Sequence, residues 1–323
     1  MKLIVQIPCY NEEATLPATL KDIPAAIDGV TSVELMIIDD GSTDRTVEVA
    51  RELGVKHIVR HKKNRGLARA FMTGIDAALR LNADIIVNTD GDNQYYGGDI
   101  AALVKPIIDN SADMVVGDRQ VDTIAHFSSS KKKLQKLGSG VVRRFSETDV
   151  TDTTSGFRAF SREAALKMNV ISNYSYTLET IIDAGLKKMV IENVPVKTNG
   201  KLRESRLFKS TSAYIRNSAM TILRTATTKN PLKIFLPVAL VFLALGLFLA
   251  IRFLVFYIMG DGNGHVQSLL FAAILLISAF IMAMFALLAD ANSAQRKVMD
   301  EVLYRVKKLE YGDNEKKDNE QGG

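Results

Sequence analysis

Short apolar runs alternate with helical patterns from the start of the chain to Val196. Runs rich in β-branched residues predict strands at 2–8, 33–39, 56–60, 85–89 and 114–117, and weaker patterns add strands at 156–161 and 189–196. Apolar residues at helical spacing between them predict helices at 13–27, 44–53, 67–81 and 99–110. This alternation predicts an α/β domain in which helices cover a mostly parallel sheet.

The hydropathy pattern changes in the last third of the chain. Residues 234–259 are apolar except for Arg252, and residues 266–289 carry no charge. A membrane span needs about 20 such residues, so the two runs predict two transmembrane helices. Buried core helices are the alternative, but two long runs in tandem favour the membrane. Arg252 lies nearer the hairpin end and is expected to extend its charge toward the membrane surface.

The charges beside these runs predict an orientation in the membrane. The connection 260–265 contains no Lys or Arg, whereas residues 200–233 hold eight basic residues against one acid. The positive-inside rule therefore places the N-terminal domain and the C-terminal tail in the cytosol. Residues 1–8 form a strand-like run without a cleavage region, which is unlike a signal peptide.

Two further patterns flank the apolar runs. Apolar residues recur at helical spacing over 207–224 with basic residues between them, which suits either a helix on the membrane surface or a core-facing helix, and the neighbouring span favours the surface. Met299, Val302, Val306 and Leu309 follow a 3-4-3 spacing that fits a seam between subunits of a homo-oligomer, although it is too short for a coiled coil on its own. Residues 312–323 are polar and predict a disordered tail.

These patterns divide the chain into four predicted parts. They are a cytosolic domain at 1–205, amphipathic juxtamembrane helices at 206–231, a transmembrane hairpin at 232–290, and a cytosolic helix with a disordered tail at 291–323.

The amino-acid composition indicates the cellular compartment and the binding partners that we expect. The chain of 323 residues has a formal net charge of +5, with the excess beside the membrane segment, so anionic lipid is the expected partner of the basic residues. No aromatic platform accompanies those residues and Trp is absent, which argues against nucleic-acid binding. A lone Cys9 excludes an internal disulfide and fits a reducing compartment.

Candidate chemistry lies where the predicted strands end. The strand at 85–89 leads into Asp90-Gly91-Asp92, a pair of carboxylates that suits a divalent cation but also suits a simple turn. The strands at 2–8 and 33–39 lead into the polar segments 8–13 and 39–44. All three ends belong to one edge of a parallel sheet, where open α/β sheets bind ligands.

The polar segments at this edge suit a nucleotide. A Tyr can stack on a base, and carboxylates can accept hydrogen bonds from base or ribose. The chain has neither of the glycine-rich phosphate loops, G-x-G-x-x-G or G-x-x-x-x-G-K-[ST]. A bound diphosphate would therefore be held by a metal ion and by basic side chains.

Five polar segments follow one another along the chain, at 7–12, 37–44, 64–66, 90–94 and 155–158. In this order they resemble the successive signatures of family 2 glycosyltransferases, in particular those that transfer sugars to polyprenyl phosphates. The resemblance implies a GT-A catalytic domain with a Rossmann-like sheet, a nucleotide-diphosphate sugar donor, a Mg²⁺ or Mn²⁺ ion, and inversion at the anomeric carbon. The reaction implied is transfer of one sugar, with UDP as the expected nucleotide, to undecaprenyl or dolichyl phosphate at the membrane, for cell-envelope glycan or protein glycosylation.

The resemblance also implies roles for individual residues. Those matched to the nucleotide sugar are Pro8, Tyr10, Glu12, Ile38, Asp40, Asp90 and Gly91. Those matched to the metal are Asp90, Asp92 and Gln94, with Asp92 also counted as catalytic. Those matched to the acceptor and its phosphate are Arg119, Ser155, Arg203 and Arg206. Asp152 matches a carboxylate proposed as a base in some relatives, and capping of the turn at 153–156 is the alternative role.

The chemistry of a lipid-phosphate acceptor is consistent with these roles. Its second pKa near ~6 leaves the phosphate largely dianionic at neutral pH, so the nucleophile needs little help from a base. The guanidinium fork suits phosphate, and Arg203 and Arg206 stand between the catalytic domain and the membrane.

Three other functions fit the pattern less well. A processive polysaccharide synthase would carry a Gln-x-x-Arg-Trp motif, and the chain has no Trp. A sugar-phosphate nucleotidyltransferase would have a glycine-rich, basic loop after the first strand, where this chain has Tyr10-Asn11-Glu12-Glu13. A non-catalytic membrane scaffold of the same fold would be marked by broken carboxylates, whereas Asp90, Asp92 and Gln94 are all present.

Overall fold

A computed structural model describes residues 1–120, 148–170, 176–200, 231–260 and 262–320, together with positions 140, 143, 220 and 227. The chain forms two compact units. One consists of Met1–Ile222 with Val302–Gly323, and the other of Leu223–Glu301. The first is called the catalytic unit below and the second the hairpin unit. The predicted amphipathic segment 206–231, with Arg203 and Arg206 near it, lies almost entirely outside the described residues.

The described elements of the catalytic unit start with a strand and alternate along the chain. They are β1 (Lys2–Cys9), α1 (Leu16–Asp22), β2 (Ser32–Asp39), α2 (Thr46–Glu52), β3 (His57–Arg60), α3 (Leu67–Arg80), β4 (Ile85–Asn88), the 3₁₀ turn η1 (Gly97–Asp99), α4 (Ile100–Ile108), β5 (Met114–Asp118), β6 (Arg158–Ser161), α6 (Arg162–Lys167), α7 (Tyr176–Leu186) and β7 (Ile191–Pro195).

The strands form one sheet of seven in the order β3-β2-β1-β4-β6-β5-β7. The pairs β3·β2, β2·β1, β1·β4 and β5·β7 are parallel. Only β6 among the described strands runs against its neighbours β4 and β5. The predicted mostly parallel α/β sheet is therefore confirmed, with one antiparallel strand inserted.

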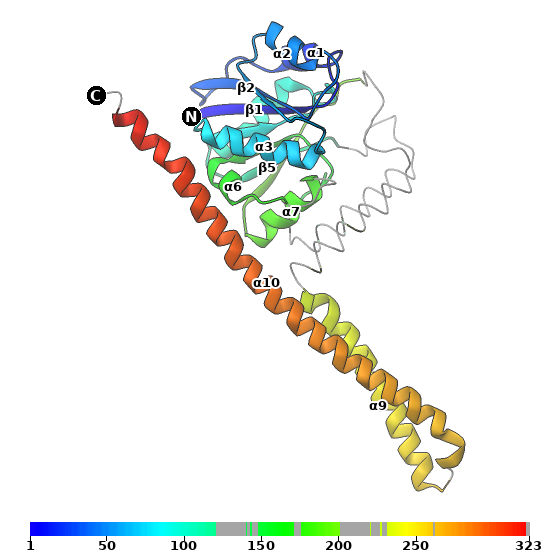
Figure 1. Cartoon of the computed structure of the whole chain (residues 1–323). Helices are drawn as coiled ribbons and strands as arrows, with labels where there is room; N and C mark the ends of the chain where they lie inside the picture. The colour runs from blue at the N-terminus through cyan, green and yellow to red at the C-terminus, as the bar shows by residue number, and fades with distance from the viewer. Residues whose placement is uncertain are drawn as a thin grey trace. The chain divides into compact units, whose positions relative to one another are not determined.

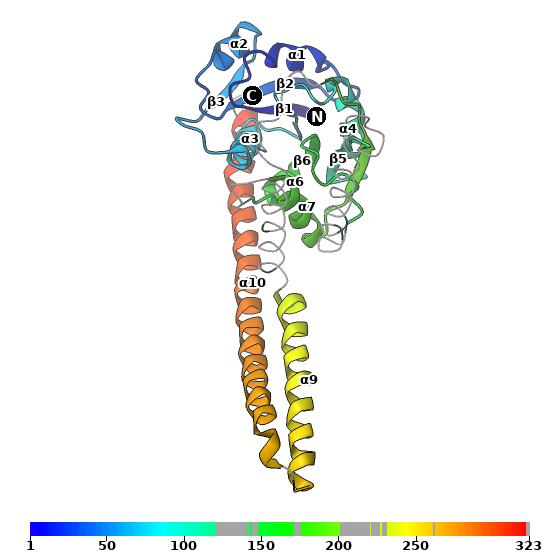
Figure 2. The same cartoon turned by 90° about the vertical axis from the view of Figure 1, so that its right-hand side faces the viewer.

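Helices cover both faces of this sheet. Helices α3, α6 and α7 pack on the face that holds Ile4 and Ile38, while α1 and α4 pack on the face that holds Leu3 and Ile37. Figures 1 and 2 show α3 on one side of β1 and β2 and α1 on the other. Strands buried on both faces read as continuous apolar runs, which is why β1, β2 and β4 stood out in the sequence.

The predicted and observed helices differ mainly at their ends. The helix predicted at 13–27 is α1 alone, because the α-helical conformation is disfavoured at Ile23, the residue before Pro24. The short helices α6 and α7 were not predicted from the sequence. At six residues, α6 is too short to show a helical period.

The hairpin unit contains α9 (Pro231–Ile258), the 3₁₀ turn η3 (Gly262–His265) and most of α10 (Val266–Glu320). Both α9 and the first part of α10 are long and apolar enough to cross a membrane. α10 ends at Glu320, inside the stretch for which the sequence predicts disorder. A helix already formed extends into a polar sequence because each further residue adds a backbone hydrogen bond.

The last part of α10, from Val302, belongs to the catalytic unit and contacts α3 and α6. Tyr311 is 3% exposed and joins the core beneath α3. Lys307 is 7% exposed and pairs with Asp76 of α3, with Nζ 3.0 Å from Oδ1. Tyr304 Oη donates to Glu163 of α6 at 2.8 Å. The catalytic unit is therefore built from two separate segments of the chain.

Candidate active site

The ends of β1, β2 and β4 meet at one edge of the sheet. The Asp40 amide, just after β2, donates to the Cys9 carbonyl at the end of β1 at 2.8 Å. Gly91, after β4, lies so close to this edge that a Cβ on it would stand 3.0 Å from Cys9 Sγ and 3.3 Å from Glu12 Cγ. The structure thus brings together the three polar segments that the sequence singled out.

Hydrogen bonds fasten the loop after β1 to the loop after β2. The Asn11 amide donates to Ser42 Oγ at 2.9 Å, and the Glu12 amide donates to Thr46 Oγ1 at 2.8 Å. Asn11 takes a φ of +53°, a left-handed conformation that Asn tolerates better than most residues. Tyr10, which precedes Asn11, is 40% exposed.

Asp40 is held at this edge by three donors. Its Oδ1 accepts from the Arg65 amide at 2.8 Å, its Oδ2 accepts from the Gly66 amide at 2.8 Å, and His61 Nδ1 lies 2.7 Å from Oδ1. His61 Nε2 in turn lies 3.1 Å from Thr73 Oγ1 on α3. The carboxylate therefore sits at the N-terminus of α3, where the helix dipole favours negative charge.

Sequence reasoning missed His61 in this arrangement. The available signal was its position, one residue beyond the end of β3 and so at the same edge of the sheet as Asp40. Ile38, by contrast, is fully buried, so its side chain belongs to the core.

Asp90-Gly91-Asp92 is both a turn and a pair of carboxylates placed at the edge. Thr15, the residue before α1, and Thr19 of α1 donate from their hydroxyls to the Gly91 carbonyl at 2.8 and 3.2 Å. The Gln94 amide donates to Asp92 Oδ1 at 3.2 Å. Asp90, Asp92 and Gln94 are all partly exposed. The two interpretations drawn from the sequence are therefore compatible.

The donor set of this turn fits a divalent cation that is shared with a substrate. Groups of three or more His, Cys, Asp or Glu side chains that could hold a metal do not occur in the described part of the chain. Two carboxylates and one amide oxygen are nevertheless hard ligands, which Mg²⁺ and Mn²⁺ prefer. Mg²⁺ is commonly bound through one or two carboxylates plus substrate phosphates. Asp90, Asp92 and Gln94 match that pattern.

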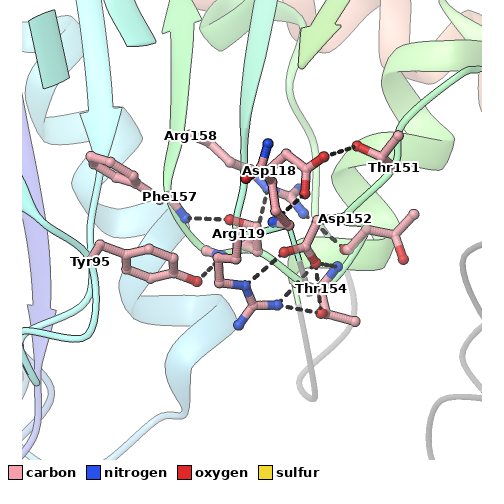
Figure 3. Close-up of polar contacts among 12 residues, drawn as sticks. Tyr95, Asp118, Arg119, Thr151, Asp152, Thr154, Phe157 and Arg158 are labelled. Carbon is pink, nitrogen blue, oxygen red and sulfur yellow. Dashed lines mark hydrogen bonds and ion pairs between the residues drawn. The ribbon is translucent and has the colours of Figure 1, made fainter. Parts of the chain in front are cut away.

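A second cluster surrounds Arg119, just after β5 (Figure 3). Arg119 forms a bidentate ion pair with Asp152, through Nε to Oδ2 at 2.7 Å and Nη2 to Oδ1 at 2.9 Å. It also donates to Thr154 Oγ1 at 2.7 Å. The side chains of Arg119 and Asp152 are 15% and 1% exposed. The guanidinium lies over the ring of Tyr95, 5.9 Å from its centroid.

The ion pair determines the protonation state of Asp152. Burial raises the pKa of this carboxyl, but the charge and hydrogen bonds of Arg119 outweigh burial and leave the pKa below its ordinary value. For Arg119, burial alone would lower the pKa, yet Tyr95 and Asp152 raise it. A carboxylate with a lowered pKa is a weak base, so Asp152 is better suited to holding Arg119 than to taking up a proton.

Gly156 joins the two clusters. A Cβ on Gly156 would stand 2.8 Å from Tyr176 Oη and 3.1 Å from each carboxylate oxygen of Asp90, so a larger residue would crowd both side chains. The Gly156 amide donates to Tyr95 Oη at 2.8 Å, and its carbonyl accepts from Asn88 Nδ2 at 2.9 Å. Asp90 and the Arg119–Asp152 pair consequently belong to one site.

A buried arginine shapes the turn that carries Asp152 and Ser155. Arg158 is fully buried and donates to the carbonyls of Thr153, Ser155 and Thr177 and to the hydroxyl of Thr180. Burial lowers its pKa to about 10. Ser155 is itself fully buried, and its hydroxyl accepts from the Phe157 amide. The segment 155–158, read from the sequence as a signature, thus has a clear structural role.

The chain belongs to glycosyl transferase family 2, whose sequence profile matches residues 4–168. The UDP-N-acetylglucosamine–dolichyl-phosphate N-acetylglucosaminyltransferase of Methanococcus voltae is 32% identical over 217 residues, which cover 59% of this chain and 83% of that protein. Glycosyltransferase AglJ of Haloferax volcanii is 27% identical over 310 residues, which cover 94% of this chain and 96% of that protein. The predicted family is confirmed, and the chain is a glycosyltransferase.

A solved structure shows the same fold. Glucosyl-3-phosphoglycerate synthase from Mycobacterium tuberculosis, crystallised with Mn²⁺, UDP-glucose and phosphoglyceric acid, superposes with a TM-score of 0.56 at 22% identity. The match covers 70% of this chain and 79% of that one. The GT-A-like mixed sheet expected from the sequence is thereby confirmed.

Proposed function

We propose that this glycosyltransferase moves a single sugar, with inversion, from a UDP-sugar to a polyprenyl phosphate at the cytosolic face of a membrane, with a bound Mg²⁺ or Mn²⁺. The observation that supports this most strongly is the meeting of three groups at one sheet edge. They are the fixed carboxylate of Asp40, the Asp90-Gly91-Asp92 turn and the Arg119–Asp152 pair. The same chain carries two helices of membrane-spanning length.

The donor would lie across the ends of β1, β2 and β4. The exposed ring of Tyr10 is placed to stack on a base, and the fixed carboxylate of Asp40 to accept a base or ribose hydrogen. Pro8, Glu12 and the backbone of Ile38 line the same edge, with Gly91 against them. UDP is proposed because one relative is named for a UDP-sugar donor and the solved neighbour holds UDP-glucose.

The diphosphate would meet the chain at the Asp90-Gly91-Asp92 turn. Asp92 and Gln94 would hold the metal, with Asp90 between it and the ribose. When bound, such an ion acts as a Lewis acid that stabilises the negative charge on the leaving oxygens.

Arg119 would bind the acceptor phosphate. Because the phosphate is a dianion at neutral pH, it can replace the Asp152 carboxylate as a partner of the guanidinium. Asp152 would then serve to hold Arg119 in place before the acceptor arrives. Arg203 and Arg206, outside the described residues, are proposed as further contacts to this phosphate, and Ser155 supports the turn beside it.

The orientation in the membrane is proposed from charge. The basic excess of residues 200–233, and a hairpin connection without Lys or Arg, support a cytosolic location for the catalytic unit and both termini. Anionic lipids would attract the same basic residues.

The proposal is tested with purified protein in lipid vesicles, a radiolabelled panel of nucleotide sugars, undecaprenyl phosphate and Mn²⁺ or Mg²⁺. We expect one labelled lipid carrying a single sugar, and loss of product with a chelator. Transfer only to a soluble acceptor would overturn the lipid assignment, and a polymeric product would indicate a processive synthase.

The Asp92→Ala variant tests the role of the turn. It should abolish turnover, since the charge on the leaving diphosphate would lose its partner. Asp109→Ala is the matched control, because Asp109 is a half-exposed carboxylate at the end of α4 that pairs with Lys105 across one helical turn. A rate for Asp92→Ala within about threefold of wild type, equivalent to less than ~1 kcal/mol of barrier, would contradict the assignment.

A further inference from the structure

The last part of α10 presents two different faces. One face packs on the catalytic unit through Tyr304, Lys307 and Tyr311, at the i, i+3, i+7 spacing of a helix side. The other face carries the apolar residues that the sequence marked by their spacing. Val302, Val306 and Leu309 are 48%, 51% and 70% exposed, and Met299, one turn before this part of the helix, is 67% exposed. These four residues are called the apolar stripe below.

The packed face fixes the rotation of the helix. Lys307 is held by Asp76 at 3.0 Å, the Tyr311 carbonyl accepts from Arg162 Nη2 at 3.0 Å, and Tyr304 Oη donates to Glu163 at 2.8 Å. A helix held on one side by contacts to two other helices cannot turn its apolar stripe inward. Within the described part of the catalytic unit the stripe is left exposed, so it is open to a partner.

The spacing of the stripe matches the a and d positions of a heptad. With Met299 and Val306 at a, and Val302 and Leu309 at d, the packed residues Tyr304 and Tyr311 fall at f and Lys307 falls at b. These positions lie on the side of the helix opposite a and d. The same assignment places Arg305 at g and Glu310 at e, and both are exposed.

The charges select both the partner and its direction. In a parallel pair of helices, position g of one chain faces position e of the next heptad in the other chain. Arg305 of each copy would therefore face Glu310 of the other copy. An antiparallel pair would instead place like charges opposite each other. Two copies of one membrane protein enter the bilayer with the same orientation, which makes their α10 helices parallel. Glu310 also pairs with Arg80 at 3.2 Å but remains 50% exposed, so it is accessible to a second partner.

We infer that the apolar stripe pairs with the stripe of a second copy of this chain to form a short, parallel, two-helix seam. A seam of this length is too short to hold free peptides together, but confinement of both chains to one membrane raises their effective concentration. The bilayer itself is a poorer partner. Met299 stands nine residues past Asp290, the first charge after the apolar part of α10, a rise of about 14 Å along the helix.

Single engineered cysteines test the seam, because the lone native thiol is Cys9, which is 2% exposed. Val306→Cys and Leu309→Cys are prepared in the full-length chain and oxidised in native membrane vesicles. We expect a covalent dimer on a non-reducing gel. Glu301→Cys, an exposed position c of the same helix, is the matched control and should yield little dimer.

Charge reversal adds a second measurement that does not depend on the apolar residues. Arg305→Glu should lower the Val306→Cys dimer yield by about fivefold, because the introduced carboxylate of each copy would then face Glu310 of the other copy, and the two negative charges repel. Adding Glu310→Arg should restore the yield, since the attraction is then re-formed with exchanged signs. Equal cross-linking at 301 and 306, or no dimer at 306 and 309 in a folded chain, would overturn the seam. Protection of Val306→Cys from a membrane-impermeant thiol reagent without dimer formation would assign the stripe to the bilayer and also overturn it.

Discussion

At the residue scale, His61 shows how one side chain determines the state of another. Asp40 has both oxygens engaged by backbone amides, and His61 adds a short contact to Oδ1. His61 is itself fixed by Thr73 of α3. The orientation of the Asp40 carboxylate therefore depends on a residue twenty-one positions away in sequence.

His61→Ala should weaken donor binding more than chemistry. Losing one hydrogen bond to a buried carboxylate is expected to raise the KM for the nucleotide sugar on the order of tenfold, with kcat changed much less. The measurement is steady-state kinetics with the donor varied. His57→Ala is the matched control, since His57 makes a similar contact to Glu34 at 2.7 Å at the opposite end of β3. Equal effects of the two substitutions would show that His61 has no particular role in the site.

The Arg119–Asp152 pair makes a pH-dependent contribution to stability. The folded pKa of Asp152 lies below its ordinary value of about 3.9, because Arg119 outweighs the effect of burial. The pair therefore stabilises the folded chain fully above that value, and the contribution is lost as the pH falls through the lowered pKa. The difference in thermal midpoint between wild type and Asp152→Asn, followed by circular dichroism, should be constant from about pH 6 to 8 and shrink below about pH 4. A difference that grows on acidification would contradict the ion pair.

The site residues that could be predicted from the sequence pattern are those that directly follow a predicted strand. Asp40, Asp90 and Asp92 follow apolar runs, and the edge of a parallel sheet then brings them together. His61 and Tyr95 act through contacts between segments distant in sequence, which no local pattern carries. Asp152 and Arg119 were each identified as candidates, but their mutual ion pair appears only in the fold.

At the element scale, the end of α10 illustrates how one helix can carry two patterns. Its apolar stripe dominated the sequence pattern, while the face that packs on α3 and α6 is made of Tyr and Lys side chains. Such amphipathic side chains bury their apolar parts and keep a polar tip paired, so they leave little trace in a hydropathy pattern. This is why the packing of α10 on the catalytic unit was not predicted.

Lys307→Glu should destabilise the catalytic unit by about 2 kcal/mol, because it places a second negative charge against Asp76 at a mostly buried position. Unfolding can be followed by maleimide labelling of Cys9 in urea. Burial, then the Glu12 and Asp39 carboxylates, raise the pKa of this thiol, so it reacts only once β1 opens.

Two variants complete this experiment. Lys105→Glu makes the same charge change at an exposed lysine of α4 that pairs with Asp109 across one helical turn, and it should shift the midpoint little. Adding Asp76→Lys to Lys307→Glu restores opposite charges and should recover most of the loss. Failure of the double variant to exceed Lys307→Glu would show that the ion pair does not hold the helix.

At the scale of the whole molecule, the catalytic unit is discontinuous in sequence. Residues 302–323 return to a domain that the chain left about eighty residues earlier, at Ile222. The family profile ends at residue 168, so sequence similarity alone does not indicate that the final helix belongs to the catalytic unit. The domain predicted at 1–205 likewise consists of one continuous segment of the chain.

Deleting residues 302–323, with both apolar helices kept, should therefore destabilise the N-terminal domain itself. The deletion removes Tyr311 from the core and uncovers the surface of α3 and α6, at a cost of at least about 3 kcal/mol. Cys9 labelling in urea should show a midpoint lower than that of Lys307→Glu.

A synthetic peptide of residues 302–323 should raise the midpoint of the deletion variant again as its concentration increases, because it binds only the folded unit. The same peptide with Tyr311→Ala and Lys307→Glu should have no effect. An unchanged midpoint after deletion would mean that the helix merely rests on the domain, and the discontinuous unit would have to be abandoned.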